Sequence, residues 1–316
     1  MLSGTGQAKV GEETTRVLVA REAVINQETV SAITRELLHR ATVKLPLYVK
    51  EAILQAYERE TSQRARDQLR IILDNISIAE EYNLCVCQDT GVPLFYVKVG
   101  SAVSVEGDIR EAIARGTKLA TEEIPLRQNV IHPLTKKNSG TNTGWGMPYV
   151  HFDVEPDVDY MEITVLPKGF GSEAKTSLLY IATSEDIALG LTKCVLDTVL
   201  SALGDPCPPY IIGIGLGGTA EIATWLAKKA FLRPLGTSNP DPLVAKLEAD
   251  LLQAVNKTGI GAMGVGGSVT ALGVHIEFCG THTAAVPVAI SFQCWAARSS
   301  TARIYSNDRV EYLTKH

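Results

Sequence analysis

Apolar residues recur every three or four positions in the first part of the chain, which is the spacing of one buried face on an α-helix. The residues that carry this pattern are Val30, Ile33, Leu37, Leu38, Ile53, Tyr57, Leu69, Ile72, Leu73 and Ile76. Just before them, Asn26 and Thr29 both have side-chain oxygens suited to capping the first helix. The pattern therefore predicts a helical region that ends near Glu81, preceded by a polar arm over residues 1–22.

After Glu81, short runs rich in β-branched and aromatic residues are mixed with helical patterns. Strands are expected at Val92–Val99, Tyr160–Leu166, Tyr210–Ile214, His275–Phe278 and Ala285–Phe292. Helices are expected at Asp108–Glu123, Glu185–Leu203, Thr219–Leu232 and Pro242–Lys257. This mixture predicts an α/β (mixed α+β) fold with sheets flanked by helices. A doubly wound sheet is not predicted, because regular strand–helix alternation fails at 138–148 and 265–294.

No repeat, low-complexity tract or linker divides the chain. The stretch 236–242 reads GTSNPDP, which is rich in turn-forming residues and is interpreted as a loop within the fold. We therefore expect an N-terminal arm over 1–22 and a single domain over 23–316.

The composition is that of a folded protein, because 45% hydrophobic residues are ample for a buried core. With 30 Lys and Arg against 35 Asp and Glu, the net charge of -5 leaves no basic excess for nucleic-acid binding. No apolar run reaches the ~18–20 residues that a membrane span needs. The N-terminus also lacks the hydrophobic core of a signal peptide, so a cytoplasmic location is expected.

A glycine motif at 213–218 (GIGLGG) matches the G-x-G-x-x-G pattern of dinucleotide-binding turns, since it follows an apolar strand and precedes a helix. An acidic residue is expected about 20 residues later, at the end of a second strand. Residues 233–240 instead read RPLGTSNP, which is typical of a loop. Besides an NAD-binding oxidoreductase, the motif is compatible with tight packing of a helix on a sheet, or with a pocket for another anion.

Six cysteines are present: Cys85, Cys87, Cys194, Cys207, Cys279 and Cys294. In a chain without an export signal they should stay reduced, and any one of them is most simply a small buried residue. A zinc site is disfavoured, because there is no C-x-x-C pair and Cys85 with Cys87 cannot supply four ligands. His275 is interpreted as a hydrogen-bonded core residue. Iron–sulfur ligands can lie far apart in sequence, so Cys87, Cys207 and Cys294 remain candidates for a cluster with one open iron.

The motifs CQDTG (87–91), KGFGSE (168–173), CPP (207–209) and a Thr281-His pair upstream of Cys294 occur in this order. Together they resemble the class I (iron–sulfur) fumarate hydratase/tartrate dehydratase family. The resemblance extends from about Ala23 to Arg298 and is to the α subunit, or to the N-terminal domain of single-chain forms. It implies a hydro-lyase with a substrate-binding 4Fe–4S cluster.

The same resemblance implies roles for individual residues. The cluster ligands would be Cys87, Cys207 and Cys294, and the substrate-binding residues Gln88, Asp89, Arg127, Gly171 and His282. Asp89 and His282 are the catalytic candidates, with Asp89 moving a proton to or from the substrate hydroxyl. Arg127 would bind a carboxylate through its planar guanidinium, and the Gly171 backbone would approach the ligand closely. Taken without the resemblance, Asp89 could cap a turn and Arg127 could form a surface ion pair.

Other positions take supporting roles or depart from the family pattern. Lys168 and Glu173 would support the site, whereas the three remaining cysteines (Cys85, Cys194 and Cys279) are interpreted as packing residues. Phe170 stands where the family usually has the middle glycine of KGGGSE, and Gln128 stands where it commonly has proline. Both departures bear on the shape of the substrate pocket.

The resemblance also implies a partner, because the family completes its active site with a β subunit or a C-terminal domain that supplies the general base, a threonine. We therefore expect an α subunit of a hetero-oligomer that is inactive alone. The predicted reaction is reversible hydration of fumarate to malate. Conversion of L-tartrate to oxaloacetate is the main alternative, and mesaconate is a further possible substrate.

Overall fold

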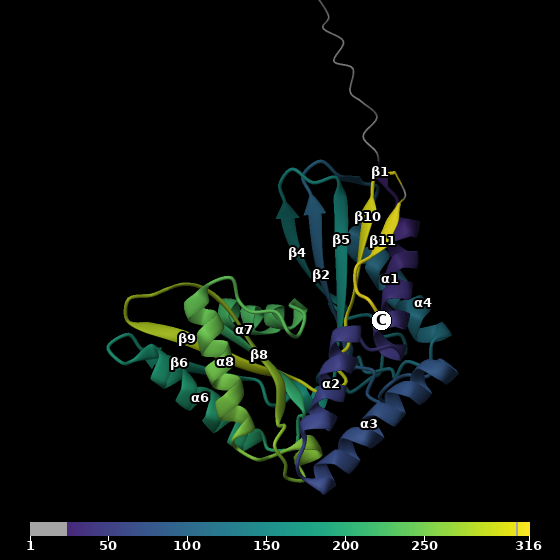
Figure 1. Cartoon of the computed structure of the whole chain (residues 1–316). Helices are drawn as coiled ribbons and strands as arrows, with labels where there is room; N and C mark the ends of the chain where they lie inside the picture. Colours follow the sequence, from purple (N-terminus) through teal and green to yellow (C-terminus); the bar gives the residue numbers. More distant parts are fainter. Residues whose placement is uncertain (1–23, 308) are drawn as a thin grey trace, which may run out of the picture.

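A computed structural model describes residues 24–307 and 309–316, so the predicted arm over residues 1–22 lies outside the described residues. The described chain forms two lobes, one built on a five-stranded sheet and the other on a four-stranded sheet (Figure 1). Helices flank both sheets, and three of them begin the described chain. The predicted mixed α/β fold with a helical N-terminal region is therefore confirmed.

The first three helices are α1 (Gln27–Val43), α2 (Leu47–Arg59) and α3 (Gln63–Tyr82). Asn26 caps α1, because its side-chain oxygen accepts a hydrogen bond of 2.8 Å from the Thr29 N–H. Apolar residues of α2 and α3 pack with Tyr96 and Leu166 of one sheet and with Ile211 of the other. These two helices therefore join the lobes.

The five-stranded sheet has the strand order β11-β10-β5-β2-β4. Its strands are β2 (Val92–Gly100), β4 (Tyr149–Glu155), β5 (Tyr160–Lys168), β10 (Ser300–Tyr305) and β11 (Val310–Tyr312). Only β2 and β4 pair in parallel, and the other neighbours are antiparallel. The apolar core of this lobe lies between the sheet and the helices α1 and α4 (Ile109–Glu123). A separate short pair joins β1 (Val24–Ile25) to β3 (Ser104–Val105).

The four-stranded sheet has the order β6-β9-β7-β8, and its strands are β6 (Ser177–Ala182), β7 (Tyr210–Gly218), β8 (Ala271–Thr281) and β9 (Ala285–Gln293). The helices α6 (Ile187–Ala202) and α8 (Pro242–Asn256) share one apolar core with it. Helix α7 (Ala220–Lys229) packs on β7 and β9. Three short helical segments lie in the loops between these elements: α5 (Phe170–Glu173), η1 (Ala230–Leu232) and η2 (Ala262–Gly264).

The glycine motif at 213–218 lies inside strand β7 and does not form a turn between strand and helix. A Cβ atom on Gly215 would lie 1.9 Å from the Ala223 carbonyl oxygen, and one on Gly213 would lie 2.1 Å from that of Ala227. The glycines therefore let α7 approach the sheet closely. The interpretation as helix–sheet packing is confirmed, and a dinucleotide-binding turn is excluded because the strand continues through the motif.

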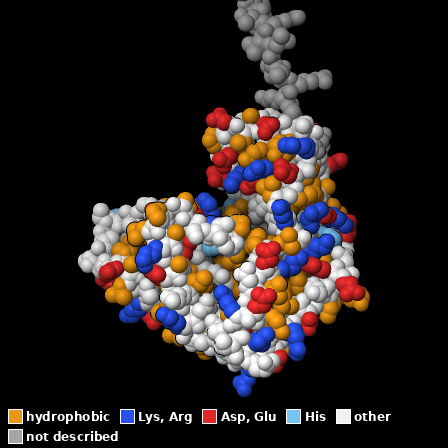
Figure 2. Space-filling view, in the orientation of Figure 1, with side chains coloured by type: hydrophobic (Ala, Val, Ile, Leu, Met, Phe, Trp, Pro, Cys, Tyr) orange, Lys and Arg blue, Asp and Glu red, His pale blue; other side chains and the backbone are white. Residues whose placement is uncertain are grey.

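The surface of both lobes carries mixed charge. On the face shown in Figure 2, basic and acidic side chains are interspersed. Among the helices of the described residues, none is long and apolar enough to cross a membrane.

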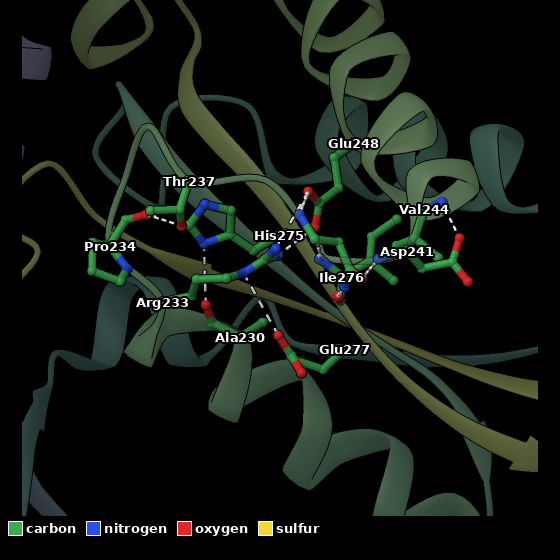
Figure 3. Close-up of polar contacts among 11 residues, drawn as sticks. Ala230, Arg233, Pro234, Thr237, Asp241, Val244, Glu248, His275, Ile276 and Glu277 are labelled. Atoms are coloured by element: carbon green, nitrogen blue, oxygen red, sulfur yellow. Dashed lines mark hydrogen bonds and ion pairs between the residues drawn. The ribbon is translucent and has the colours of Figure 1, made fainter.

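A buried polar cluster holds α8 against β8 and the turn after α7 (Figure 3). Glu248, which is 6% exposed, pairs with Arg233 and accepts hydrogen bonds from the backbone N–H groups of Asn239 and Ile276. The His275 ring lies 3.1 Å from the carbonyl oxygen of Ala230, as expected of a hydrogen-bonded core histidine. Burial and the nearby Arg233 lower the pKa of His275, so its ring is neutral at pH 7.

A Glu248→Gln variant is expected to lower the free energy of unfolding by about 3 kcal/mol, because it leaves the Arg233 charge buried without its main partner. Urea unfolding followed by circular dichroism measures this change. Asp250→Asn is the matched control on the same helix, since its ion pair with Lys246 is exposed and should contribute less than about 0.5 kcal/mol. Equal effects of the two substitutions would contradict a structural role for the cluster.

Candidate functional site

Two of the predicted cluster ligands meet at one end of the four-stranded sheet. Cys207 lies between α6 and β7, and Cys294 directly follows β9. Because β7 and β9 are antiparallel neighbours, with Ile211 opposite Gln293, the start of one strand adjoins the end of the other. The Trp295 N–H donates a 3.1 Å hydrogen bond to the Cys207 carbonyl. Cys207 has a φ of 56°, a left-handed conformation that non-glycine residues adopt rarely.

The third predicted ligand, Cys87, reaches the same place from the other lobe, on the loop between α3 and β2. The Arg298 Nη1 atom, four residues after Cys294, donates a 2.7 Å hydrogen bond to the carbonyl of Asp89, which ties the two segments together. Burial raises the pKa of Cys207, and the neighbouring Cys294 and Cys87 raise it further. The structure therefore brings Cys87 and Cys294 close enough to Cys207 to affect the pKa of its thiol.

The other three cysteines differ in their surroundings, although all six are free thiols. Cys85 packs against the core beneath α1 and α4, and Cys194 packs against the core beneath α6 and α8. Both match the predicted packing role. Cys279 is exposed on β8, so its predicted role as a buried packing residue is wrong.

Buried positive charge surrounds the Cys294 thiol. Burial raises the pKa of Cys294, whereas the cations Arg298 and Lys168 act in the opposite direction and favour the thiolate. The Nε atom of Arg298 is buried and has no hydrogen-bond acceptor among the described residues. Three thiols beside an uncompensated cation form a donor set suited to an anionic, sulfur-ligated group.

No group of three or more His, Cys, Asp or Glu side chains that could hold a metal ion is found in the described part of the chain. In an iron–sulfur cluster each thiolate binds a different iron, so the ligands need not converge on one point.

Asp89 lies at the wall of a neighbouring cavity of about 560 Å³. Its Oδ1 accepts hydrogen bonds of 3.1 Å from both the Gly91 N–H and the Asn129 side-chain amide. Its Oδ2 accepts one of 2.8 Å from the Phe170 N–H. Three chain segments therefore fix the carboxylate in one orientation: its own loop, the segment containing Asn129, and the turn at α5.

The polar lining of the cavity combines three cations with two carboxylates: Arg127, Lys168, Lys228, Asp89 and Glu173. Glu173 bridges the two lysines, at 2.5 Å from Lys228 and 3.5 Å from Lys168. Burial favours the protonated form of Glu173, but the two lysines hold the pKa of its carboxyl group below the usual value. Burial lowers the pKa of Lys168 to about 8, although Glu173 opposes this change. The cavity has a net positive lining suited to an anion.

Arg127 lies in this cavity together with Asp89, as the sequence predicted. Its backbone N–H donates to the Thr90 hydroxyl at 3.0 Å, and its carbonyl accepts from the side chain of Asn142 at 3.0 Å. These contacts anchor the arginine to the loop that carries Asp89. The Arg127 residue itself is exposed, so these backbone contacts place it at the cavity and leave the alternative of a surface ion pair open.

The remaining predicted site residues are placed differently. Gln88 is exposed beside Cys87, and Gly171 is exposed on α5, where an added Cβ would lie 3.3 Å from the Asp205 carbonyl of the Cys207 loop. His282 lies in the turn between β8 and β9, at the opposite end of the four-stranded sheet from Cys294. The structure does not bring His282 together with the three cysteines, so its role in the same site stays a prediction.

Three residues of the site were not assigned a role from the sequence: Asn129, Lys228 and Arg298. Asn129 lies two residues after Arg127, and this position was the available signal. Lys228 is an ordinary residue near the end of an amphipathic helix, and Arg298 lies in a segment without a regular pattern. Nothing local in the sequence distinguishes these two from surface residues.

Comparison with known proteins agrees with this arrangement. Residues 31–303 match the model of the fumarate hydratase (fumerase) family. A Methanocaldococcus jannaschii protein named "Putative L(+)-tartrate dehydratase subunit alpha" is 45% identical over 278 residues, which are 87% of this chain and 97% of that protein. The L(+)-tartrate dehydratase subunit alpha of Escherichia coli K12 is 34% identical over 273 residues, which are 86% of this chain and 90% of that one. By these matches the chain belongs to the class I fumarate hydratase family of hydro-lyases, among its alpha subunits.

Proposed function

We propose that this chain is the cluster-binding α subunit of a hydro-lyase that reversibly hydrates fumarate to malate. The observation that carries the proposal is the convergence of three free thiols beside a cavity that contains both Asp89 and Arg127. Cys87, Cys207 and Cys294 would hold a 4Fe–4S cluster. When bound, such a cluster supplies a Lewis-acidic iron that binds the substrate carboxylate and hydroxyl.

The chain's own residues would orient the substrate and move a proton. Arg127 is suited to bind a carboxylate through two parallel N–H donors. Asp89 is the proton-transfer group, because its Oδ2 accepts one hydrogen bond among the described residues and keeps a lone pair for a substrate hydroxyl. Asn129 holds the other oxygen and prevents the carboxylate from rotating. Gln88 and the Gly171 backbone would complete the contacts made by this chain at the cavity. His282, at the opposite end of the four-stranded sheet, is not among the residues that line it.

The cavity has an apolar side formed by Val92, Leu94 and the exposed Phe170, and its other lining residues are polar. The apolar side suits the carbon chain of fumarate, whereas the polar side offers hydrogen-bond partners to the hydroxyl groups of malate and of tartrate alike. The choice of fumarate therefore rests on the family match. The names of the two relatives support L-tartrate dehydration to oxaloacetate as the second candidate.

We infer that residues 23–316 act as one unit that needs a β subunit to complete its site. The names "subunit alpha" of the relatives support this inference. The open side of the cavity, where Phe170 is exposed, is available to a partner that would bring the general base. Six free thiols suit a reducing compartment, which supports a cytoplasmic location.

Steady-state kinetics on the chain reconstituted with iron, sulfide and its β subunit, without oxygen, test the substrate and the partner together. The value of kcat/KM is expected to be higher for fumarate than for L-tartrate, and mesaconate serves as a third substrate. A ratio that favours tartrate would replace the proposed substrate. Turnover by the cluster-loaded chain alone would remove the need for a partner.

A further inference from the structure

Arg298 has the largest fully buried side chain among the described residues and is only 1% exposed. It lies in the segment 294–299, which crosses from β9 in the four-stranded sheet to β10 in the five-stranded sheet. A buried guanidinium loses its hydration, and this loss is costly unless an anion or several acceptors replace the water. The partners of Arg298 therefore need to be identified.

The protein partners of Arg298 do not compensate its charge. Its Nη1 donates to the Asp89 carbonyl at 2.7 Å, and its Nε has no acceptor among the described residues. Across 24–307 and 309–316, no Asp or Glu oxygen lies within ion-pair distance of it. Lys168, the other buried cation of the site, differs because Glu173 lies 3.5 Å from it and the Ser172 hydroxyl accepts a hydrogen bond from it at 2.7 Å.

The groups that face Arg298 are those of the proposed cluster site. Its carbonyl partner is two residues after Cys87, and Arg298 itself is four residues after Cys294. Arg298 is also among the charged groups near the Cys294 thiol. The Asp89 Oδ2 and the Arg298 Nη2 both lie beside Gly169 without forming an ion pair, so the Asp89 carboxylate offsets the charge only in part. The other source of negative charge is the cysteine side, where three thiolates would gather.

We propose that Arg298 is a positioning residue of the cluster site, whose buried charge lies beside the Cys294 ligand and whose hydrogen bond to the Asp89 carbonyl fixes the Cys87 loop. The inference rests on the proposed function. Arg298 has no role in touching the substrate. It places a positive charge next to the cluster. Its hydrogen bond also holds the loop of Cys87, from one lobe, beside the segment of Cys294, from the other.

Removing this charge has a measurable consequence. A nearby positive charge favours the reduced, more negative state of an iron–sulfur centre, so its loss lowers the reduction potential. The variant Arg298→Met is expected to shift the one-electron reduction equilibrium about tenfold toward the oxidised form, which is about 59 mV. Arg298→Lys keeps the charge and is expected to keep the wild-type potential.

The test uses the full chain, purified and reconstituted without oxygen, with folding checked by circular dichroism. Iron and sulfide content is measured, and dithionite titration with viologen mediators, followed by electron paramagnetic resonance, gives the potential. Arg303→Met is the matched control, because Arg303 lies five residues later and pairs with Glu162 on β5, away from the cysteines. It should leave iron content and potential unchanged.

The outcomes separate this inference from the proposed function. A wild-type chain that takes up no iron overturns the cluster itself. A folded R298M protein with wild-type iron content and potential overturns the role of Arg298 and leaves the cluster standing. An R298K protein whose reduction equilibrium shifts tenfold or more, which is about 59 mV in potential, overturns the charge assignment. This test applies even if R298M does not fold.

Discussion

Replacing Cys207 by serine is expected to abolish cluster assembly and to reduce turnover by at least about 1,000-fold, to the level of the metal-free protein. The physical reason is that a serine oxygen binds iron far less well than a thiolate, which is the ligand that holds these clusters. The Cys207 carbonyl accepts a hydrogen bond from the N–H of Trp295, the residue after Cys294, and this bond does not involve the thiol. The substitution should therefore remove the ligand and leave the fold in place.

Iron and sulfide content after anaerobic reconstitution, together with the visible absorption of the protein, measures this effect. Cys194→Ser is the matched control, because Cys194 packs against a helix–sheet core away from the three candidate ligands. It is expected to bind a full complement of iron. A C207S protein that keeps iron and activity would exclude Cys207 as a ligand and would reopen the assignment of all three thiols.

Asp89→Asn should lower kcat by about 100- to 10,000-fold, because an amide cannot exchange a proton with the substrate hydroxyl at neutral pH. The amide has nearly the same shape, and the backbone carbonyl that binds Arg298 is untouched. Cluster content is accordingly expected to stay within error of the wild type. The split between normal iron content and lost turnover distinguishes a chemical role from a structural one.

Steady-state kinetics of the reconstituted pair and parallel iron analysis check this prediction. Asp74→Asn, on the exposed face of α3, is the control for a general loss of negative charge. Unchanged kcat in D89N would leave Asp89 as a turn residue that supports the loop, which is the alternative that the sequence left open.

The fold could be predicted where one strong pattern decides it. The capped helix at Asn26, the helices at Asp108 and Pro242, and the buried strand at Tyr210 follow from periodicity and capping residues, and all are found in the structure. The strands β4, β6 and β10 were not predicted. Strands β4 and β6 are sheet edges with few buried positions, and β10 consists mostly of small or polar residues. Their strand state comes from pairing with neighbours, which local patterning does not encode.

The site was only partly readable from the sequence. The resemblance gave the three candidate ligands, but their spacing of more than 80 residues could not show that they meet, since that depends on the register of β7 against β9. The carboxylate of Asp89 and the guanidinium of Arg127 were predicted to share a site, and they line the same cavity. Lys228 and Arg298 could not be found, because their importance comes from burial that only the folded chain creates.

The proposed ligands come from both lobes, with Cys87 before β2 and the other two at the end of the four-stranded sheet. A cofactor held by all three would cross-link the lobes, and a group that binds only the folded form stabilises it. The resistance of the protein to heat and proteolysis would then increase with the supply of iron in the cell. Chains that lose the cofactor to oxidants would lose this link and keep the apolar contacts of α2 and α3 between the lobes, so proteases would remove them before intact copies.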